Sequence, residues 1–400
     1  MIAAAIALMA AAFPPAPDPA RHGGEKTYHF GREERLTTIR FEARAQVGTL
    51  VGFTHRASGS AQVDFEAGSG RCKVSVPVDS LTFGVAGIDN ALRMAAWMDS
   101  KNHPLLEFAA DKAAPGPQPD TWRVDGRWTM RGVSRPLSVL AQVTPLPEPL
   151  GRRLGPGEWI RVRARWTLRL SDHGIKIPEK SLLTVADSWT VSLDMLGSTE
   201  PPTAAAPPKD EDEETFRPVR PEKIDPPEAP GRRYKLGKKP QLSTFLVEAP
   251  GETGTALALS KIASGWIVLD GAQGKIKLSA PAKAFKTGLR DLDGRIPDLL
   301  SADANPHLRF ESTAMARKED GTWTVKGSIE ARGTKRPVEL EAAMRSITGE
   351  QMAAAGWGEK EAVGFSAALR IRPADFGIPV PEGWLVEWTL LVDLLGELEE

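Results

Sequence analysis

The chain carries one sequence pattern twice. The stretch RGVSRPL at 131–137 returns as RGTKRPV at 332–338. Three further pairs of segments follow in the same order: LTTIRFEA (36–43) with LSTFLVEA (242–249), NHPLLEF (102–108) with ANPHLRF (304–310), and LRLSDHGIKIP (168–178) with LRIRPADFGIPVP (369–381). A chain of 400 residues with this ordered repeat must fold as two copies of one unit.

A segment of different composition separates the copies. Residues 198–230 contain nine prolines and an acidic block at 210–214, with few residues able to enter a core. Such a composition favours an extended, self-repelling linker. We therefore predict a first domain at 26–197, a linker at 198–230 and a second domain at 231–400.

The N-terminal segment differs from both domains. Residues 1–12 read MIAAAIALMAAA, which is too short to span a bilayer but fits the apolar region of a signal peptide. We predict that residues 1–20 form a leader and that the protein is periplasmic or secreted, with no stable membrane span. If the segment is not a signal, the protein is cytoplasmic.

Within each domain, apolar and polar residues alternate. In TWRVDGRWTM, the side chains of Trp122, Val124 and Trp128 share one face, and charged residues occupy the other. This period of two predicts strands with one apolar and one wet face. Gly132 and Gly333 follow such runs and supply hairpin positions where a positive φ is favourable.

One segment in each domain has helical spacing instead. Residues 87–104 place apolar side chains on one helical face, and residues 288–306 are their counterpart. Pro297 interrupts the second segment, so we expect a shorter helix or two turns there. The predicted fold is all-β, with two tandem antiparallel barrels of about eight strands and a short helical insert in each.

The sequence lacks the motifs of common enzymes and metal sites. No two of the six histidines have metal-ligand spacing, and no nucleophile elbow or phosphate-binding loop occurs. The net charge of −1 gives no reason to expect nucleic-acid binding. The single cysteine, Cys72, lies in an alternating run and is interpreted as structural. We expect no catalysis, no metal and no cofactor.

Charged residues form two patterns of interest. Asp89 and Arg93 are four residues apart in the first helical segment, as Asp291 and Arg295 are in the second. Each pair is either a surface ion pair or part of a pocket mouth. Four arginines alternate along one strand, at 161, 163, 165 and 169, and are interpreted as a solvated outer face rather than an anion site.

Large apolar side chains are the predicted lining of the two barrel interiors. In the first domain they are Phe53, Phe65, Phe83, Trp97, Met98, Phe108, Trp128 and Trp166. In the second domain they are Phe245, Trp266, Phe285, Leu299, Leu300, Phe310 and Trp323. Periodicity alone leaves open whether this lining packs into a solid core or surrounds a cavity.

Several of these motifs, in this order, resemble the YceI-like family of polyisoprenoid-binding proteins. They are HPLLEF and NPHLRF after the helical segment, the hairpins GVSRP and GTKRP, and the late DHGI and DFGI. The resemblance covers both domains and excludes the leader and the linker. Ala91 occupies the family's histidine position in the first helical segment, and Trp97 and Met98 stand in place of its paired aromatic residues.

The resemblance implies a lipocalin-like barrel with an elongated apolar cavity. It also implies a long isoprenoid or related lipid as ligand, export to the periplasm, and binding or transport without catalysis. The alternative is a structural or adaptor protein with filled barrels that binds another protein of unknown identity.

Overall fold

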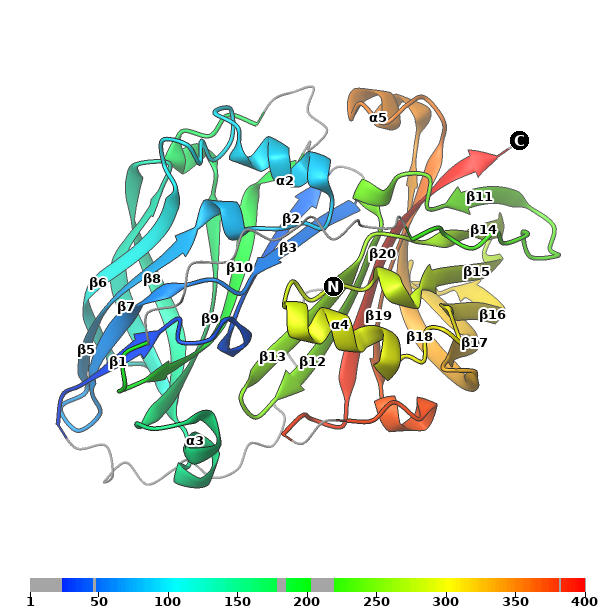
Figure 1. Ribbon diagram of the computed structural model, residues 1–400. Helices are drawn as coiled ribbons and strands as arrows, with labels where there is room; N and C mark the ends of the chain where they lie inside the picture. Colours follow the sequence, from blue (N-terminus) through cyan, green and yellow to red (C-terminus); the bar gives the residue numbers. More distant parts are fainter. Residues whose placement is uncertain (1–23, 46–47, 178–184, 203–218, 381–382, 400) are drawn as a thin grey trace.

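The computed structural model describes residues 24–45, 48–177, 185–202, 219–380 and 383–399. The predicted leader (1–20) and the middle of the predicted linker lie outside these residues. The described chain forms two antiparallel barrels side by side (Figure 1). The predicted fold class, two tandem all-β barrels, is confirmed.

The first barrel closes through eight strands paired in a ring, in which β10 returns to β1. They are β1 (Lys26–Phe30), β4 (Ser58–Asp64), β5 (Ser69–Pro77), β6 (Leu105–Pro115), β7 (Thr121–Met130), β8 (Val133–Pro145), β9 (Trp159–Arg169) and β10 (Val185–Ser198). A hairpin of β2 (Thr37–Ala45) and β3 (Gly48–Thr54) pairs onto β10. Closure leaves few unpaired strand edges.

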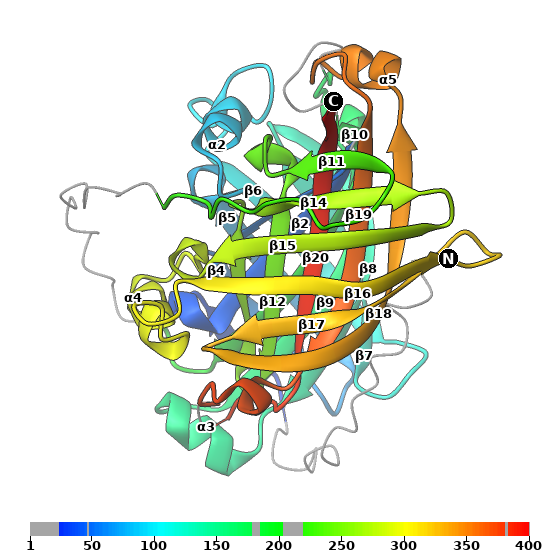
Figure 2. The ribbon, with the colours of Figure 1, turned by 90° about the vertical axis from the view of Figure 1, so that its right-hand side faces the viewer.

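The second barrel repeats this strand order. Its ring contains β11 (Arg232–Leu236), β14 (Ser264–Asp270), β15 (Gln273–Pro281), β16 (His307–Arg317), β17 (Trp323–Ala331), β18 (Thr334–Ile347), β19 (Ala362–Ile371) and β20 (Trp388–Glu399). The hairpin of β12 (Thr244–Gly251) and β13 (Gly254–Ser260) pairs onto β20. Figure 2 shows β14 to β17 crossing in front of β12 and β20.

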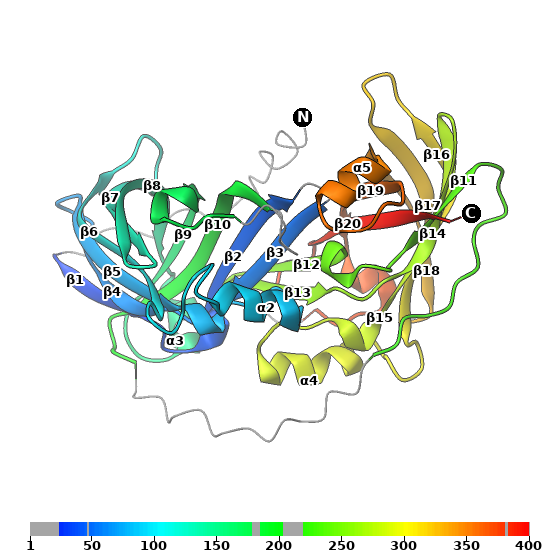
Figure 3. The ribbon, with the colours of Figure 1, turned by 90° about the horizontal axis from the view of Figure 1, so that it is seen from above.

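The helical segments are α2 (Ala86–Arg93) and α4 (Arg290–Leu299), which lie on the same side of the molecule (Figure 3). The prediction that Pro297 shortens the second helix is wrong, because α4 is the longer of the two and contains Pro297 near its end. A proline in the last turn removes only one helical hydrogen bond. Each barrel also has a second short helix that was not predicted, α3 (Glu148–Leu154) or α5 (Gly349–Ala354).

The repeated RGxxRP motif forms the β7–β8 and β17–β18 turns. Arg131 and Gly132 both have positive φ, at 51° and 73°, and Arg332 and Gly333 repeat this. The guanidinium of Arg131 donates to the carbonyl of Gly174 at 2.9 Å, and Arg135 donates to the carbonyl of Asp172 at 2.7 Å. The motif thus ties one hairpin to the DHGI turn in the first barrel, and its copy makes the corresponding bonds in the second.

The two barrels pack through their extra hairpins, as Figure 3 shows from above. Val51 and Phe53 of the first barrel form one apolar cluster with Leu246, Leu257 and Leu259 of the second. Phe53 and Leu259 occupy equivalent positions in β3 and β13. Equivalent hairpins therefore face each other, so the contact has approximate two-fold character.

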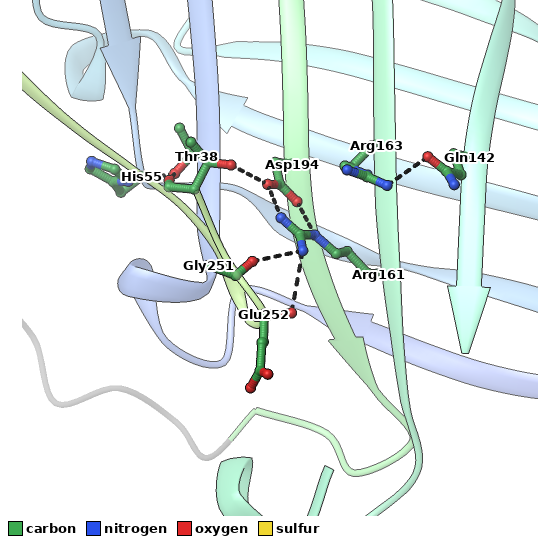
Figure 4. Close-up of polar contacts among 9 residues, drawn as sticks. Thr38, His55, Gln142, Arg161, Arg163, Asp194, Gly251 and Glu252 are labelled. Atoms are coloured by element: carbon green, nitrogen blue, oxygen red, sulfur yellow. Dashed lines mark hydrogen bonds and ion pairs between the residues drawn. The ribbon is translucent and has the colours of Figure 1, made fainter. Parts of the chain in front are cut away.

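Polar contacts surround this cluster. Arg161 forms an ion pair with Asp194 at 2.6 Å and donates to the carbonyls of Gly251 and Glu252 in the other barrel (Figure 4). Thr255 donates to Asp194 at 2.9 Å, and the ring of His55 lies 2.8 Å from the carbonyl of Thr287. The interpretation of the arginine strand as wholly solvated is therefore wrong at Arg161, which the neighbouring barrel covers.

The end of the predicted linker lies against the second barrel. The carboxylate of Glu222 accepts hydrogen bonds from Arg309 at 2.8 and 3.0 Å, and these bonds lower the pKa of Glu222. The indole of Trp266 donates to the carbonyl of Ile224 at 2.7 Å. Residues 219–230 are thus held on the barrel surface rather than extended away from it.

Candidate ligand cavity in the first barrel

An apolar cavity of about 120 Å³ lies inside the first barrel. Its wall comes from strands on all sides of the ring, including Ala61 and Cys72 on β4 and β5, Phe108 and Trp128 on β6 and β7, and Val162 and Trp166 on β9. Alternation places these side chains inward while their neighbours face outward.

Two of the tryptophans in this wall, Trp128 and Trp166, contact each other. Trp128 is directly opposite Phe108 in the β6–β7 pair, and Trp166 is opposite Val191 in the β9–β10 pair. The rings of Trp128 and Trp166 meet edge to face, with centroids 5.7 Å apart. Edge-to-face contact is a favoured arrangement for aromatic pairs, so it fixes both rings at the cavity.

The cavity has little charge. Burial raises the pKa of the Cys72 thiol to about 11, so this side chain is neutral at physiological pH. Gln62 and Arg71 border the cavity, but they alternate with the inward residues Ala61 and Cys72, and Arg71 donates to Gln62. In the described part of the chain, no cluster of three His, Cys, Asp or Glu side chains is arranged to hold a metal. The site is built for apolar contact.

Three predicted lining residues border the cavity: Phe108, Trp128 and Trp166. The buried side chains of Phe83, Trp97 and Met98 belong to the core of the same barrel but do not border the cavity. The half-buried Phe65 packs edge-on against Trp122.

The prediction needs correction at Phe53 and Trp266. Phe53 has the opposite parity to the inward residues of β3 and packs in the inter-barrel cluster. Trp266 alternates with the buried Ile267 and faces outward, where the ammonium of Lys235 lies 5.4 Å from its ring. Phe53 is buried between the barrels, and Trp266 is half-buried on the outer surface of the second barrel. Neither side chain lines a barrel interior.

The remaining predicted residues of the second barrel lie in or beside its core. Phe245, Phe285, Phe310 and Trp323 are buried in one cluster, against which the half-buried Leu300 packs. Leu299 is half-buried at the end of α4 and is not part of that cluster.

The predicted pocket mouths have another role. The carboxylate of Asp89 accepts hydrogen bonds from the Phe83 amide at 2.6 Å and the Thr82 hydroxyl at 2.9 Å. Arg93 turns away and donates to the carbonyl of Asp79 at 3.0 Å. None of these residues borders the cavity.

The predicted counterpart of Asp89 also needs correction. Asp293, rather than the exposed Asp291, accepts from the amide and hydroxyl of Thr287, at 2.5 and 2.7 Å. Arg295 is exposed on the same helix. These aspartates fix the turns that precede α2 and α4, so their role is structural.

Sequence reasoning missed the small residues of the cavity wall. Ala61, Cys72, Val162 and Ala164 leave the space that the aromatic residues border. The signal was available at three of these positions, because the repeat aligns Ala61, Cys72 and Val162 with larger residues in the second domain. In β14 and β15, Ile267 and Ile276 occupy the positions of Ala61 and Cys72.

A closed antiparallel barrel around an apolar cavity defines a class of small-ligand-binding proteins. A family model described as the YceI-like domain matches residues 33–196 and 248–397. These matches cover most of the chain, which therefore belongs to the YceI-like family and contains two copies of its domain. The family predicted from the sequence motifs is confirmed.

Three solved structures resemble one domain of the chain. BcnA of Burkholderia cenocepacia has 17% identity and a TM-score of 0.35, covering 41% of this chain and 98% of BcnA. A YceI protein of Campylobacter jejuni has 17% identity and a TM-score of 0.34, with coverage of 39% and 88%. A polyisoprenoid binding domain of Saccharophagus degradans, implicated in plant cell wall breakdown, has 12% identity and a TM-score of 0.31, with coverage of 42% and 98%. No curated protein matches the chain.

Proposed function

We propose that the first barrel binds a long isoprenoid or related lipid, without catalysis, and so stores or transports it. The observation that carries this proposal is the apolar cavity bordered by Phe108, Trp128 and Trp166. Membership of the YceI-like family supports the choice of an isoprenoid. Burial of apolar surface drives such binding, and a chain of about 40 carbons gains at most roughly 12 kcal/mol.

Binding requires the barrel interior to open further. The cavity of about 120 Å³ holds only a short part of a long lipid, since pockets for drug-sized ligands measure about 300–1,000 Å³. We propose that side chains inside the barrel change rotamer as the lipid enters, and that the cavity thereby lengthens along the barrel axis. Part of the binding energy is then used for this rearrangement, so the measured affinity falls below the upper limit given above.

For the second barrel we propose a structural role. Ile267, Ile276 and Phe365 are buried at positions where the first barrel has Ala61, Cys72 and Val162. Larger side chains at these positions favour a filled interior. The filled barrel of the alternative interpretation fits this domain, which packs against the first barrel of the same chain. Binding of another protein stays a prediction.

We also propose that the protein acts in the periplasm, on the basis of the apolar segment at 1–12 and the leader predicted at 1–20. No helix within the described ranges combines the length and apolarity needed to cross a bilayer. N-terminal sequencing of protein from the periplasmic fraction tests the proposal. Recovery of the intact N-terminus from the cytoplasm alone would contradict it.

A matched pair of variants tests the ligand proposal. Ala164 borders the cavity, opposite Ala141, and Ala367 is its counterpart in the second barrel, opposite Ala342. Native mass spectrometry of the full chain purified from cells should detect one lipid per chain in the wild type and in Ala367→Phe, but none in Ala164→Phe. Lipid-free wild-type protein that takes up no added isoprenoid would refute the proposal.

A further inference from the structure

Both ring nitrogens of His55 face carbonyl oxygens at the contact between the barrels. Nδ1 lies 2.6 Å from the carbonyl oxygen of Thr37 in the same barrel, and Nε2 lies 2.8 Å from that of Thr287 in the other barrel. His55 is 6% exposed, so the ring has little contact with solvent. A carbonyl oxygen only accepts hydrogen bonds, and a neutral imidazole has a single N–H. Both contacts are therefore hydrogen bonds only when the ring is a doubly protonated imidazolium.

The neighbouring hydroxyl group does not relieve a neutral ring. The Oγ1 atom of Thr38 lies 3.4 Å from Nδ1 of His55, and Figure 4 shows the two side chains together. This hydroxyl donates its one proton to the carbonyl of Thr255 at 2.7 Å. In the neutral tautomer with its proton on Nε2, the lone pair of Nδ1 therefore faces the carbonyl oxygen of Thr37. In the other tautomer the same repulsion arises at Thr287.

The second barrel places a cation at the equivalent position. The segments FTHRASG (53–59) and LSKIASG (259–265) align His55 with Lys261. The side chain of Lys261 is buried against the turn that precedes α2 in the first barrel, and its ammonium donates to the hydroxyl of Thr244 at 2.8 Å. The approximate two-fold relation between the barrels thus brings a positive side chain to one site and a histidine to the other.

The charged groups around His55 come from both barrels. They are Glu34, Arg56, Arg161 and Asp194 in the first barrel, and Lys286 and Asp293 in the second. Each of the two arginines is paired with one of the carboxylates of its own barrel, at 3.4 and 2.6 Å, and the lysine is exposed. Asp293 accepts hydrogen bonds from the amide and hydroxyl of Thr287 and adds negative charge beside the carbonyl that Nε2 faces. These surroundings favour the positive form of the ring.

We infer that the imidazolium of His55 is a proton-dependent clasp between the two barrels. The protonated ring bridges Thr37 and Thr287 and so joins the barrels, whereas the neutral ring turns one of these two contacts into a repulsion. Because the joined barrels then bind the proton more tightly than separated barrels do, the contact must strengthen as the pH falls through the range in which histidine titrates. This clasp acts between the domains and is independent of any ligand in the first barrel.

Two variants of the full chain test the clasp. His55→Lys introduces the cation of the second barrel, and His55→Gln removes the charge, so neither side chain titrates between pH 5.5 and pH 7.5 as histidine does. Hydrogen exchange in β13, which packs against the first barrel, is measured by mass spectrometry at these two pH values and corrected for the intrinsic effect of pH on exchange. The control segment is β17, which pairs with strands of its own barrel on both sides.

The quantity compared is the protection of β13 at pH 5.5 divided by its protection at pH 7.5. This ratio should be roughly 10-fold larger in the wild type than in either variant, as expected for one hydrogen bond to a charged group. Asp393 and Lys261 are present in all three proteins, so their own titration cancels from the comparison. The same ratio for β13 in all three proteins would overturn the inference.

Nitrogen NMR of the wild type needs no substitution. At pH 6.5 both ring nitrogens of His55 should carry a proton. His173 is the internal reference, because its Nδ1 lies 2.9 Å from the carbonyl oxygen of Val133 and burial lowers its pKa, so it should carry one proton. A single proton on the ring of His55 under these conditions would also overturn the inference.

Discussion

The two barrels have the same strand framework and differ in the side chains that line their interiors. Their strand order, extra hairpins and RGxxRP turns are the same. Inside, Val162 of the first barrel corresponds to Phe365 of the second, and Ala113 to Met315. At two other positions the larger side chain belongs to the first barrel, because Trp128 and Trp166 correspond to Ile329 and Leu369.

Under the proposed function, this difference separates stability from binding within one fold. A filled interior uses apolar surface to stabilise the domain, whereas a cavity keeps that surface available for a ligand. The two barrels are joined through the apolar cluster around Phe53 and Leu259. This contact fits the structural role that we propose for the second barrel.

The largest expected effect is on the stability of the filled barrel. Phe365 is 2% exposed, so Phe365→Ala should lower the free energy of unfolding by about 3–5 kcal/mol. Val162→Ala should cost only about 1 kcal/mol, because Val162 already borders a cavity. Urea denaturation followed by tryptophan fluorescence measures both values. Equal losses would contradict the distinction between a filled and a hollow barrel.

The next effect concerns the contact between the barrels. The side chains of Arg161 and Asp194 are each 11% exposed, so Asp194→Ala leaves a nearly buried guanidinium without its partner. We expect a loss of about 2–4 kcal/mol in urea denaturation. Arg153→Ala is the control, because its contact with Glu252 is long and half-exposed and should contribute under about 1 kcal/mol. A similar loss in both variants would argue against a special role for Asp194.

Asp393, the counterpart of Asp194 in the second barrel, makes a pH-dependent contribution. Burial raises the pKa of its carboxyl to about 6, with Lys261, Arg345, Thr49 and Ser366 nearby. Between about pH 6 and pH 4 the folded protein therefore holds a proton that the unfolded chain releases, so this group adds stability as the pH falls.

The comparison with Asp393→Asn isolates that contribution, since the amide imitates the protonated acid. The wild type should gain about 1–3 kcal/mol relative to this variant between pH 7 and pH 4.5. Urea denaturation at both pH values provides the measurement. A stability difference that does not change with pH would exclude a raised pKa at Asp393.

The smallest effect is expected at the repeated turns. Arg131→Ala removes hydrogen bonds to the carbonyls of Ala95 and Gly174, and Arg332→Ala removes those to Ser301 and Gly377. These arginines are half-buried, and a net hydrogen bond contributes about 1 kcal/mol, so each variant should lose about 1 kcal/mol, measured by urea denaturation. A much larger loss in one barrel would show that the two turns are not equivalent.

Much of the fold was predictable from the sequence. The repeat defines two units, and the alternation around Trp122 and Trp128 predicts strands whose apolar faces point inward. Phe108, Trp128 and Trp166 were predicted as interior residues for the same reason, and they border the cavity. These predictions depend only on local periodicity, which the barrel preserves.

The errors occur where periodicity does not determine the environment. In β3, Leu50 packs into the barrel while Val51 and Phe53 pack against the other barrel, so both faces are apolar. The alternation of residues in β3 therefore does not indicate which face of the strand points into the barrel. The cavity depends on small residues such as Ala61, and only a comparison of the two copies makes them conspicuous.

Xenon tests the central claim most directly, because it binds apolar cavities and needs no knowledge of the natural ligand. Crystals of the full chain under xenon pressure should show a strong anomalous peak inside the first barrel, between Trp166 and Val162, and no comparable peak in the second. Equal occupancy in both barrels, or xenon in the second alone, would contradict the account.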